Sequence, residues 1–322
     1  MIDYKNYRNS KVAIFHHNDL DGIGGKAVIE GYYELKGCKT ATLKMDYSEN
    51  ATNYMANFIN KFVNGNEEVL IYIVDISFTE VSLDMLNALV DAYPNTVIWL
   101  DHHKSSIDLL ASKQVHSDKF LDIVLDNTRC GCRIAYEYLY TRRSGIINII
   151  DDWDRFILSD NRTLPFKTFT DSLSEDNLTK DIKTFISLEN KEDERCGVLY
   201  YKLLEHYIQN GKIILGYLNG VNKKDLEDNA YEIKVNDLKC IVLNKQGSSS
   251  IFCSKINKDE YPIAINYYYS SKGEYVYSVT SCDENLFNCT KFAEAHGGGG
   301  HPRRSGFRNK ELIFKKGEDY RW

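Results

Sequence analysis

The sequence lacks the features that mark secreted or membrane-embedded proteins. It has eight cysteines but no Cys-x-x-Cys pair, and no apolar leader segment opens it. No run of about 18 apolar residues occurs, so we expect no membrane span. Cys130-Gly131-Cys132 has no matching second pair and is interpreted as ordinary buried cysteines rather than a soft-metal site. These absences favour reduced thiols and a cytoplasmic protein.

Excess positive charge is also missing. The chain has 40 Lys and Arg against 46 Asp and Glu, a net charge of −6. We therefore expect that it does not bind long nucleic acid through release of phosphate counterions. A phosphate-bearing ligand would have to be held locally, by a few basic groups or by metal ions.

The first half of the chain alternates apolar runs with helical patterns, which predicts an α/β fold with a parallel sheet. With 322 residues, the chain is too long for one ordinary core. The predicted strands are 11–15, the six apolar or aromatic residues before Asp75, 96–100 and 146–150. The predicted helices are 26–33, 54–62, 82–92 and 132–140.

The second half changes character twice. From about residue 161 the pattern is helical and polar, with segments 176–189 and 197–209, and is interpreted as a connector. From about residue 230 the period becomes two, which is typical of strands. We predict strands at 231–235, 240–243, 263–269, 275–279 and 312–314, and a helix at 286–296. The expected domains are 1–158, 159–225 (helical connector) and 226–322 (smaller, mixed α+β).

Asp101-His102-His103 stands at the carboxyl end of a predicted buried strand. In open α/β sheets ligands bind just outside the carboxyl ends of the strands. A capped turn with two solvated histidines would also explain the triplet by itself. Three other acidic stretches favour a site.

These stretches also follow predicted strands. They contain His16, His17, Asp19 and Asp21 after the first strand, Asp75 after the second, and Asp151, Asp152 and Asp154 after the run 146–150. So many carboxylates cannot share a pocket as bare anions, whereas divalent cations resolve the repulsion. Mixed carboxylate and imidazole ligands suit Mn²⁺, Fe²⁺, Co²⁺ or Zn²⁺, and their number suits two ions. Either histidine of the first stretch and any aspartate of the last could be the ligand.

A glycine run, Gly297 to Gly300, follows the helix predicted near the end of the chain. Glycines let the backbone approach a ligand closely and turn its N–H groups toward phosphate oxygens. His301, Arg303 and Arg304 add donors. A helix C-cap would use one or two glycines but not four with a histidine and two arginines, so phosphate binding is favoured.

Taken together, His-x-Asp-x-Asp-Gly, Asp75 at a strand end, Asp101-His102-His103, a distal Asp and Gly-Gly-Gly-Gly-His resemble the DHH phosphoesterase superfamily. The order resembles the branch with a DHH-associated carboxy-terminal domain, which includes the bacterial nanoRNases. The resemblance covers both ends of the chain but not the connector.

The resemblance implies a role for each motif position. One ion would be held by His17, Asp19 and Asp75, and a second by Asp21, Asp75 and His102, with Asp152 as the last ligand. His103 would contact the scissile phosphate or help to protonate the leaving oxygen, while Asp101 orients the histidines. The substrate would be bound by Gly298, Gly299, Gly300, His301, Arg303 and Arg304.

The activity implied is Mn²⁺-dependent hydrolysis of short oligonucleotides to nucleoside monophosphates by two-metal hydroxide attack. Alternatives are a 3′,5′-bisphosphate nucleotide phosphatase, a linear or cyclic dinucleotide phosphodiesterase, a single-strand exonuclease, or a sensor without catalysis. The resemblance is compatible with a homodimer. Family members usually have small residues where Arg303 and Arg304 stand, which leaves the substrate open.

Overall fold

The computed structural model describes residues 4–8, 10–45, 51–62, 68–78, 80–247, 249 and 256–322. The chain forms two compact units, 1–212 and 213–322. The division falls within α9 (Glu194–Asn229), the longest helix of the described residues. The helices α7 (Thr163–Thr170) and α8 (Glu175–Glu189), which we assigned to a connector, belong to the first unit. The three-part division into domains stays a prediction.

The first unit is built on a five-stranded sheet in the order β2-β1-β3-β4-β5, in which every pairing is parallel. The parallel α/β sheet that we predicted is therefore confirmed. Helices cover both faces, so the central strands are apolar throughout, as β3 is. The strands are β1 (Lys11–His17), β2 (Lys39–Met45), β3 (Val69–Val74), β4 (Val97–Asp101) and β5 (Asp122–Leu125).

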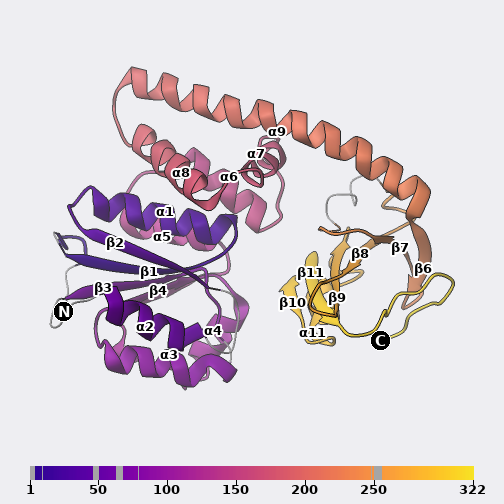
Figure 1. Cartoon of the computed structure of the whole chain (residues 1–322), viewed down its shortest axis with the longest axis horizontal. Coiled ribbons are helices and arrows are strands. Elements are labelled where there is room, and N and C mark those ends of the chain that lie inside the picture. The colour runs from indigo at the N-terminus through magenta and orange to yellow at the C-terminus, as the bar shows by residue number, and fades with distance from the viewer. Residues whose placement is uncertain are drawn as a thin grey trace. The chain divides into compact units, whose positions relative to one another are not determined.

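Figure 1 shows how the helices divide between the two faces of this sheet. One face is covered by α1 (Leu20–Glu34) and α5 (Gly131–Leu139), on which α6 (Gly145–Asp154) and α8 pack as a further layer. The other is covered by α2 (Ala51–Phe62), α3 (Glu80–Ala92) and α4 (Lys104–Ala111). A 3₁₀ turn, η1 (Ser117–Lys119), precedes β5. Because β1 and β3 are neighbours and their following helices lie on opposite faces, a crevice is expected at their carboxyl ends.

The prediction of a strand at 146–150 is wrong, because this run lies inside α6. Ser144 caps the helix by accepting a hydrogen bond from the Ile147 N–H. Ile146, Ile147, Ile149 and Ile150 are buried while Asn148 is exposed, which is the spacing of a helix face. A short continuous apolar run does not by itself separate a buried strand from a buried helix.

The second unit has a six-stranded sheet in the order β10-β11-β9-β8-β7-β6. All its pairings are antiparallel except β7 with β8. The four strands predicted between 231 and 279 are confirmed. The elements are β6 (Tyr231–Val235), β7 (Leu238–Asn244), β8 (Ile263–Tyr269), β9 (Tyr275–Ser281), α11 (Cys289–Glu294), β10 (Gly299–His301) and β11 (Arg304–Asn309).

Two predictions for this unit are corrected. Residues 312–314 form no strand: the Ile313 N–H donates to the Tyr277 hydroxyl rather than to a strand neighbour, and Phe314 is buried in the core. The helix expected at 286–296 is shorter, because the Asn288 side chain caps it by accepting from the Lys291 N–H.

Candidate metal centre

The carboxyl edge of the parallel sheet gathers the polar residues that follow its strands. His17 ends β1, and Asp19 and Asp21 open α1 directly after it. Asp75 follows β3, and Asp101 ends β4. The structure thus brings together seven of the predicted site residues, namely His17, Asp19, Asp21, Asp75, Asp101, His102 and His103.

One group of ligand atoms consists of His17, Asp19 and Asp75. His17 Nδ1 lies 2.9 Å from Asp19 Oδ2 and 3.9 Å from Asp75 Oδ2. The other oxygen of Asp19 accepts the Gly22 N–H at 2.9 Å, which caps α1. A Cβ at Gly22 would lie 2.2 Å from the His17 carbonyl oxygen, so only glycine permits this turn. Burial raises the pKa of Asp19, but the His17 hydrogen bond and charge outweigh it and lower this pKa.

A second group consists of Asp21, His102 and Asp154. The Nε2 atom of His102 lies 3.6 Å from Asp21 Oδ2 and 3.5 Å from Asp154 Oδ2. It also lies 3.3 Å from Asp75 Oδ1. Burial lowers the pKa of His102 and so favours the neutral imidazole that a metal requires.

Asp75 belongs to both halves of the cluster, with one oxygen facing His17 and the other facing His102. Its φ of 56° is left-handed, a conformation that aspartate tolerates better than most residues and that clusters at functional sites. Burial, with the charges of Asp21 and Asp19, raises its pKa well above the usual value. Buried Oδ2 accepts no hydrogen bond from any described residue. Divalent cations would satisfy this oxygen and neutralise the crowded carboxylates.

Asp101 supports the two histidines that follow it. Its buried carboxylate lies 2.8 Å from His103 Nδ1 and accepts the Ser106 hydroxyl at 2.6 Å. Although burial alone lowers the pKa of His103, the charge and hydrogen bond of Asp101 raise it to about 9. The His103 side chain is 28% exposed, so solvent and ligands can reach it.

The structure does not bring Asp152 to the cluster. Its carboxylate accepts hydrogen bonds from the Ser159 N–H and hydroxyl and from the Thr163 hydroxyl, at 2.6 to 2.9 Å. His16 also points elsewhere: its ring is buried and its Nε2 lies 3.5 Å from Glu175 on α8. Among the alternatives that the sequence left open, the geometry therefore favours His17 and Asp154.

We expect the substitutions Asp154→Asn and Asp152→Asn to have different effects. Asp154→Asn should weaken binding of Mn²⁺ while the metal-free protein melts close to wild type. Asp152→Asn should leave Mn²⁺ affinity unchanged and lower the free energy of unfolding by about 1–3 kcal/mol, since a hydrogen-bonded charge is lost. Titration calorimetry and thermal melts in chelator measure both quantities. Stronger Mn²⁺ binding by the Asp154 variant than by the Asp152 variant would contradict this assignment.

The thiols of Cys130 and Cys132 lie 3.5 Å apart beside Asp21. Burial raises the pKa of both, to about 12 for Cys132. A metal binds thiolate rather than thiol, so the raised pKa values favour packing as the role of these residues.

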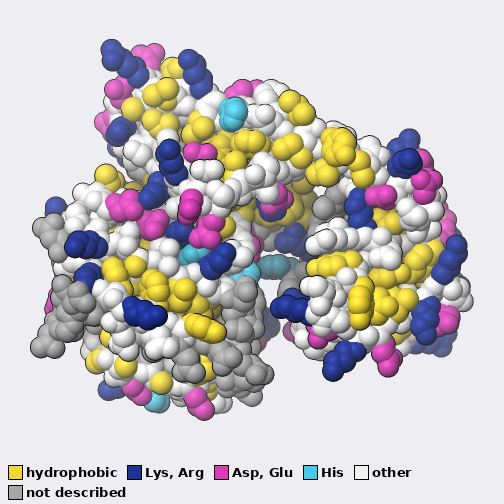
Figure 2. Space-filling model, viewed as in Figure 1, with side chains coloured by type: hydrophobic (Ala, Val, Ile, Leu, Met, Phe, Trp, Pro, Cys, Tyr) yellow, Lys and Arg dark blue, Asp and Glu magenta, His cyan; other side chains and the backbone are white. Residues whose placement is uncertain are grey.

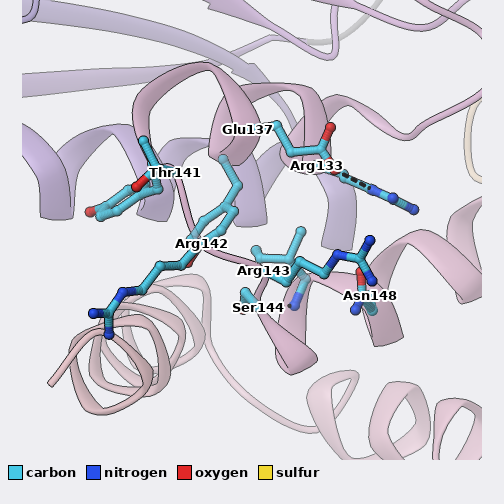
Figure 3. Close-up of a pocket in the computed structure, with 10 residues that line it drawn as sticks. Arg133, Glu137, Thr141, Arg142, Arg143, Ser144 and Asn148 are labelled. Carbon is cyan, nitrogen blue, oxygen red and sulfur yellow. Dashed lines mark hydrogen bonds and ion pairs between the residues drawn. The ribbon is translucent and has the colours of Figure 1, made fainter. Parts of the chain in front are cut away.

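A hollow of about 590 Å³ between α5 and α6 lies apart from the residues that form the cluster. Figure 3 shows Arg142 and Arg143 at this hollow and the contact between Arg133 and Glu137. Arg133 also pairs with Asp151, and Arg142 with Glu192, so two of the three arginines already have carboxylate partners. We assign no ligand to the hollow.

In the second unit, the predicted phosphate-binding segment forms a β-hairpin rather than an open loop. Gly299 to His301 pair with residues 304–306. Gly300 has a φ of 141°, and a Cβ there would lie 2.7 Å from the Arg304 carbonyl oxygen. Arg303 Nε lies 3.7 Å from Glu284 Oε2. The glycines are therefore explained in part by close strand packing.

Charge on the visible surface agrees with the composition. Figure 2 shows Lys and Arg side chains interspersed with Asp and Glu on the face in view. No helix of the described residues is both long and apolar enough to cross a membrane.

Residues 11–157 match the sequence model of the DHH family, N-terminal domain. No match was found among curated proteins. Among similar solved structures is the DHH domain of a member of the S1p family of ribosomal proteins. It has a TM-score of 0.51 and 14% identity, over 92% of this chain and 82% of that one.

Two further structures are similar at lower scores. The pGpG-specific phosphodiesterase PggH from Vibrio cholerae has a TM-score of 0.46 and 11% identity, over 93% of this chain and 92% of that one. RecJ from Thermus thermophilus, in complex with Mn²⁺, has a TM-score of 0.49 and 12% identity, over 93% of this chain and 49% of that one. At such identities the likeness concerns the fold alone. Residues 11–157, a little under half of the chain, are thus similar to the N-terminal domain of the DHH family.

Proposed function

We propose that the chain is a Mn²⁺-dependent phosphodiesterase that hydrolyses short oligonucleotides to nucleoside monophosphates. The observation that carries this proposal is the pair of ligand groups, His17–Asp19–Asp75 and Asp21–His102–Asp154, joined through the two oxygens of Asp75. Each group offers two carboxylates and one imidazole, a donor set that suits Mn²⁺.

In this proposal each group would hold one divalent cation, and Asp75 would serve both groups. Asp154 takes the last position, which the resemblance had assigned to Asp152. When bound, such cations would supply an activated water and Lewis acidity for a displacement at phosphorus. The protein's part is to hold these side chains rigidly, since every one stands at a strand end or a helix end.

His103 is the group that we assign to the leaving oxygen. Its Nδ1 is engaged by Asp101, which holds the ring in place and raises the pKa of His103. Its Nε2 would then donate a proton to the leaving oxygen or contact the scissile phosphate. Asp101 acts through His103 and is a positioning residue.

The hairpin of the second unit is the segment that we assign to the phosphates of the substrate. Gly299 and Gly300 would let a phosphate approach the backbone and His301 would supply a donor, whereas the Gly298 N–H already donates to the Ala293 carbonyl. Arg303 and Arg304 add positive charge to a chain that is acidic overall. Two arginines suit a substrate end rich in phosphate, such as a dinucleotide with a terminal phosphate.

The described cysteines form no disulfide, which fits a cytoplasmic location.

The test is hydrolysis, in the presence of Mn²⁺, of a 5′-labelled RNA dinucleotide, a trinucleotide and a long single strand. We expect mononucleotide release that falls steeply with length, and its complete loss when a chelator removes the metal. Equal rates on all lengths would instead indicate an exonuclease. Hydrolysis of a 3′,5′-bisphosphate nucleotide alone would indicate a phosphatase.

A further inference from the structure

The first turn of α5 contacts the cluster through its backbone. The N–H groups of Gly131 and Cys132 donate to Oδ2 and Oδ1 of Asp21, each at 2.7 Å. Two donors at fixed positions set the orientation of this carboxylate. Because a carboxylate oxygen can accept at two positions, each oxygen of Asp21 keeps capacity for a cation.

Asp151 ties this turn to α6. Its Oδ1 accepts the Cys130 N–H at 2.7 Å, and its Oδ2 accepts Arg133 Nη1 at 2.9 Å. Asp151 is buried, so these bonds are shielded from water. Three successive N–H groups at the start of α5 are thus satisfied by two aspartates, one of which is a proposed metal ligand.

Gly131 makes this close approach possible. A Cβ at position 131 would lie 2.8 Å from Asp75 Cβ and 3.1 Å from Asp21 Oδ2. The first distance is shorter than real side chains show and the second is tight, so α5 or Asp75 would have to move. Glycine is costly in a helix compared with alanine, and this proximity explains why it stands here.

We propose that Asp151 is a positioning residue, which holds Asp21 in its metal-binding orientation through the first turn of α5. The proposal rests on the two-cation site proposed above. It gives the three neighbouring aspartates separate roles: Asp151 orients α5, Asp152 fixes the loop before α7, and Asp154 binds metal.

The substitution Asp151→Asn tests this role. An asparagine has one oxygen for two donors, so it loses either the Cys130 or the Arg133 bond whichever way its amide turns. We expect Mn²⁺ affinity to fall about 10–100-fold, the usual effect of removing a group that orients a ligand. Titration calorimetry and the electron paramagnetic resonance signal of bound Mn²⁺ measure the affinity. Turnover should recover at high Mn²⁺, with kcat largely kept and the apparent KM for Mn²⁺ raised.

Glu137→Gln is the matched control. Glu137 lies on α5 and accepts a hydrogen bond from Arg133 Nε at 2.8 Å, much as Asp151 accepts one from Arg133 Nη1. Unlike Asp151, it accepts no hydrogen bond from the Cys130 N–H. It should keep wild-type Mn²⁺ affinity. Gly131→Ala should weaken Mn²⁺ binding as well, which gives a second variant if Asp151→Asn does not fold.

Two results would overturn the inference. One is wild-type Mn²⁺ affinity in the folded Asp151 or Gly131 variants, and the other is an equal loss of affinity in the Glu137 control. The binding measurement uses no substrate, so it can be read even if the wild-type protein fails to cleave RNA. Failure of the proposed function and failure of this inference therefore give different results.

Discussion

The variant Asp75→Asn should be inactive, and it should bind fewer Mn²⁺ ions than the wild-type protein. Asp75 is the residue shared by the two ligand groups, and an amide cannot bridge two cations as a carboxylate does. We expect the stoichiometry measured by calorimetry to fall from two ions to one or none. Hydrolysis of a dinucleotide should become undetectable at any Mn²⁺ concentration.

The same variant should not be destabilised when metal is absent. Asparagine tolerates the left-handed backbone of Asp75. It also removes a buried carboxyl group whose ionisation is opposed by burial and by Asp21 and Asp19. Thermal melts in chelator should match or exceed wild type, while the stabilisation by Mn²⁺ is lost. Normal turnover in this variant would refute the two-cation assignment.

The variant His103→Asn should lose about 10²–10⁴-fold in turnover, the usual contribution of a positioned proton donor. The asparagine amide can still donate a hydrogen bond to Asp101, as His103 Nδ1 does. The fall in turnover would therefore measure the contribution of the missing Nε2 atom. Mn²⁺ binding should be unchanged, because His103 belongs to neither of the two proposed ligand groups.

A comparison with His103→Gln separates the two roles of this residue. Glutamine can reach a phosphate oxygen as a hydrogen-bond donor but cannot transfer a proton. If His103 acts as an acid, both variants should be slow, and wild-type activity should fall as pH rises through the raised pKa of His103. That fall should be absent in both variants. Near-normal turnover with glutamine would instead indicate simple phosphate contact.

The polar residues at the strand ends were predictable because the apolar runs in the sequence show where each strand ends. An apolar run such as 69–74 is buried on both faces, and the residue that follows it must emerge at the sheet edge. Parallel strands bring all such residues to the same edge. The grouping of His17, Asp75 and His102 therefore needed only the assignment of three strands.

The last ligand could not be predicted in the same way. On a strand, Asp152 and Asp154 would share one face, so either could bind metal. On α6 they lie about 200° apart, and only one can face the cluster. Asp151, three residues before Asp154, lies on the same side of the helix and contacts α5 instead. The wrong prediction of a strand at 146–150 therefore left the last metal ligand undecided among these aspartates.

By itself the sequence determined the parallel sheet and most of the polar residues that gather at its carboxyl edge, since these depend on local apolar patterns. The tertiary structure alone decided which of three adjacent aspartates reaches the cluster, that the glycine run pairs as a hairpin, and that α5 orients Asp21. Each of these depends on how one element packs against another distant in sequence. Side-chain direction is set by that packing, and no local pattern encodes it.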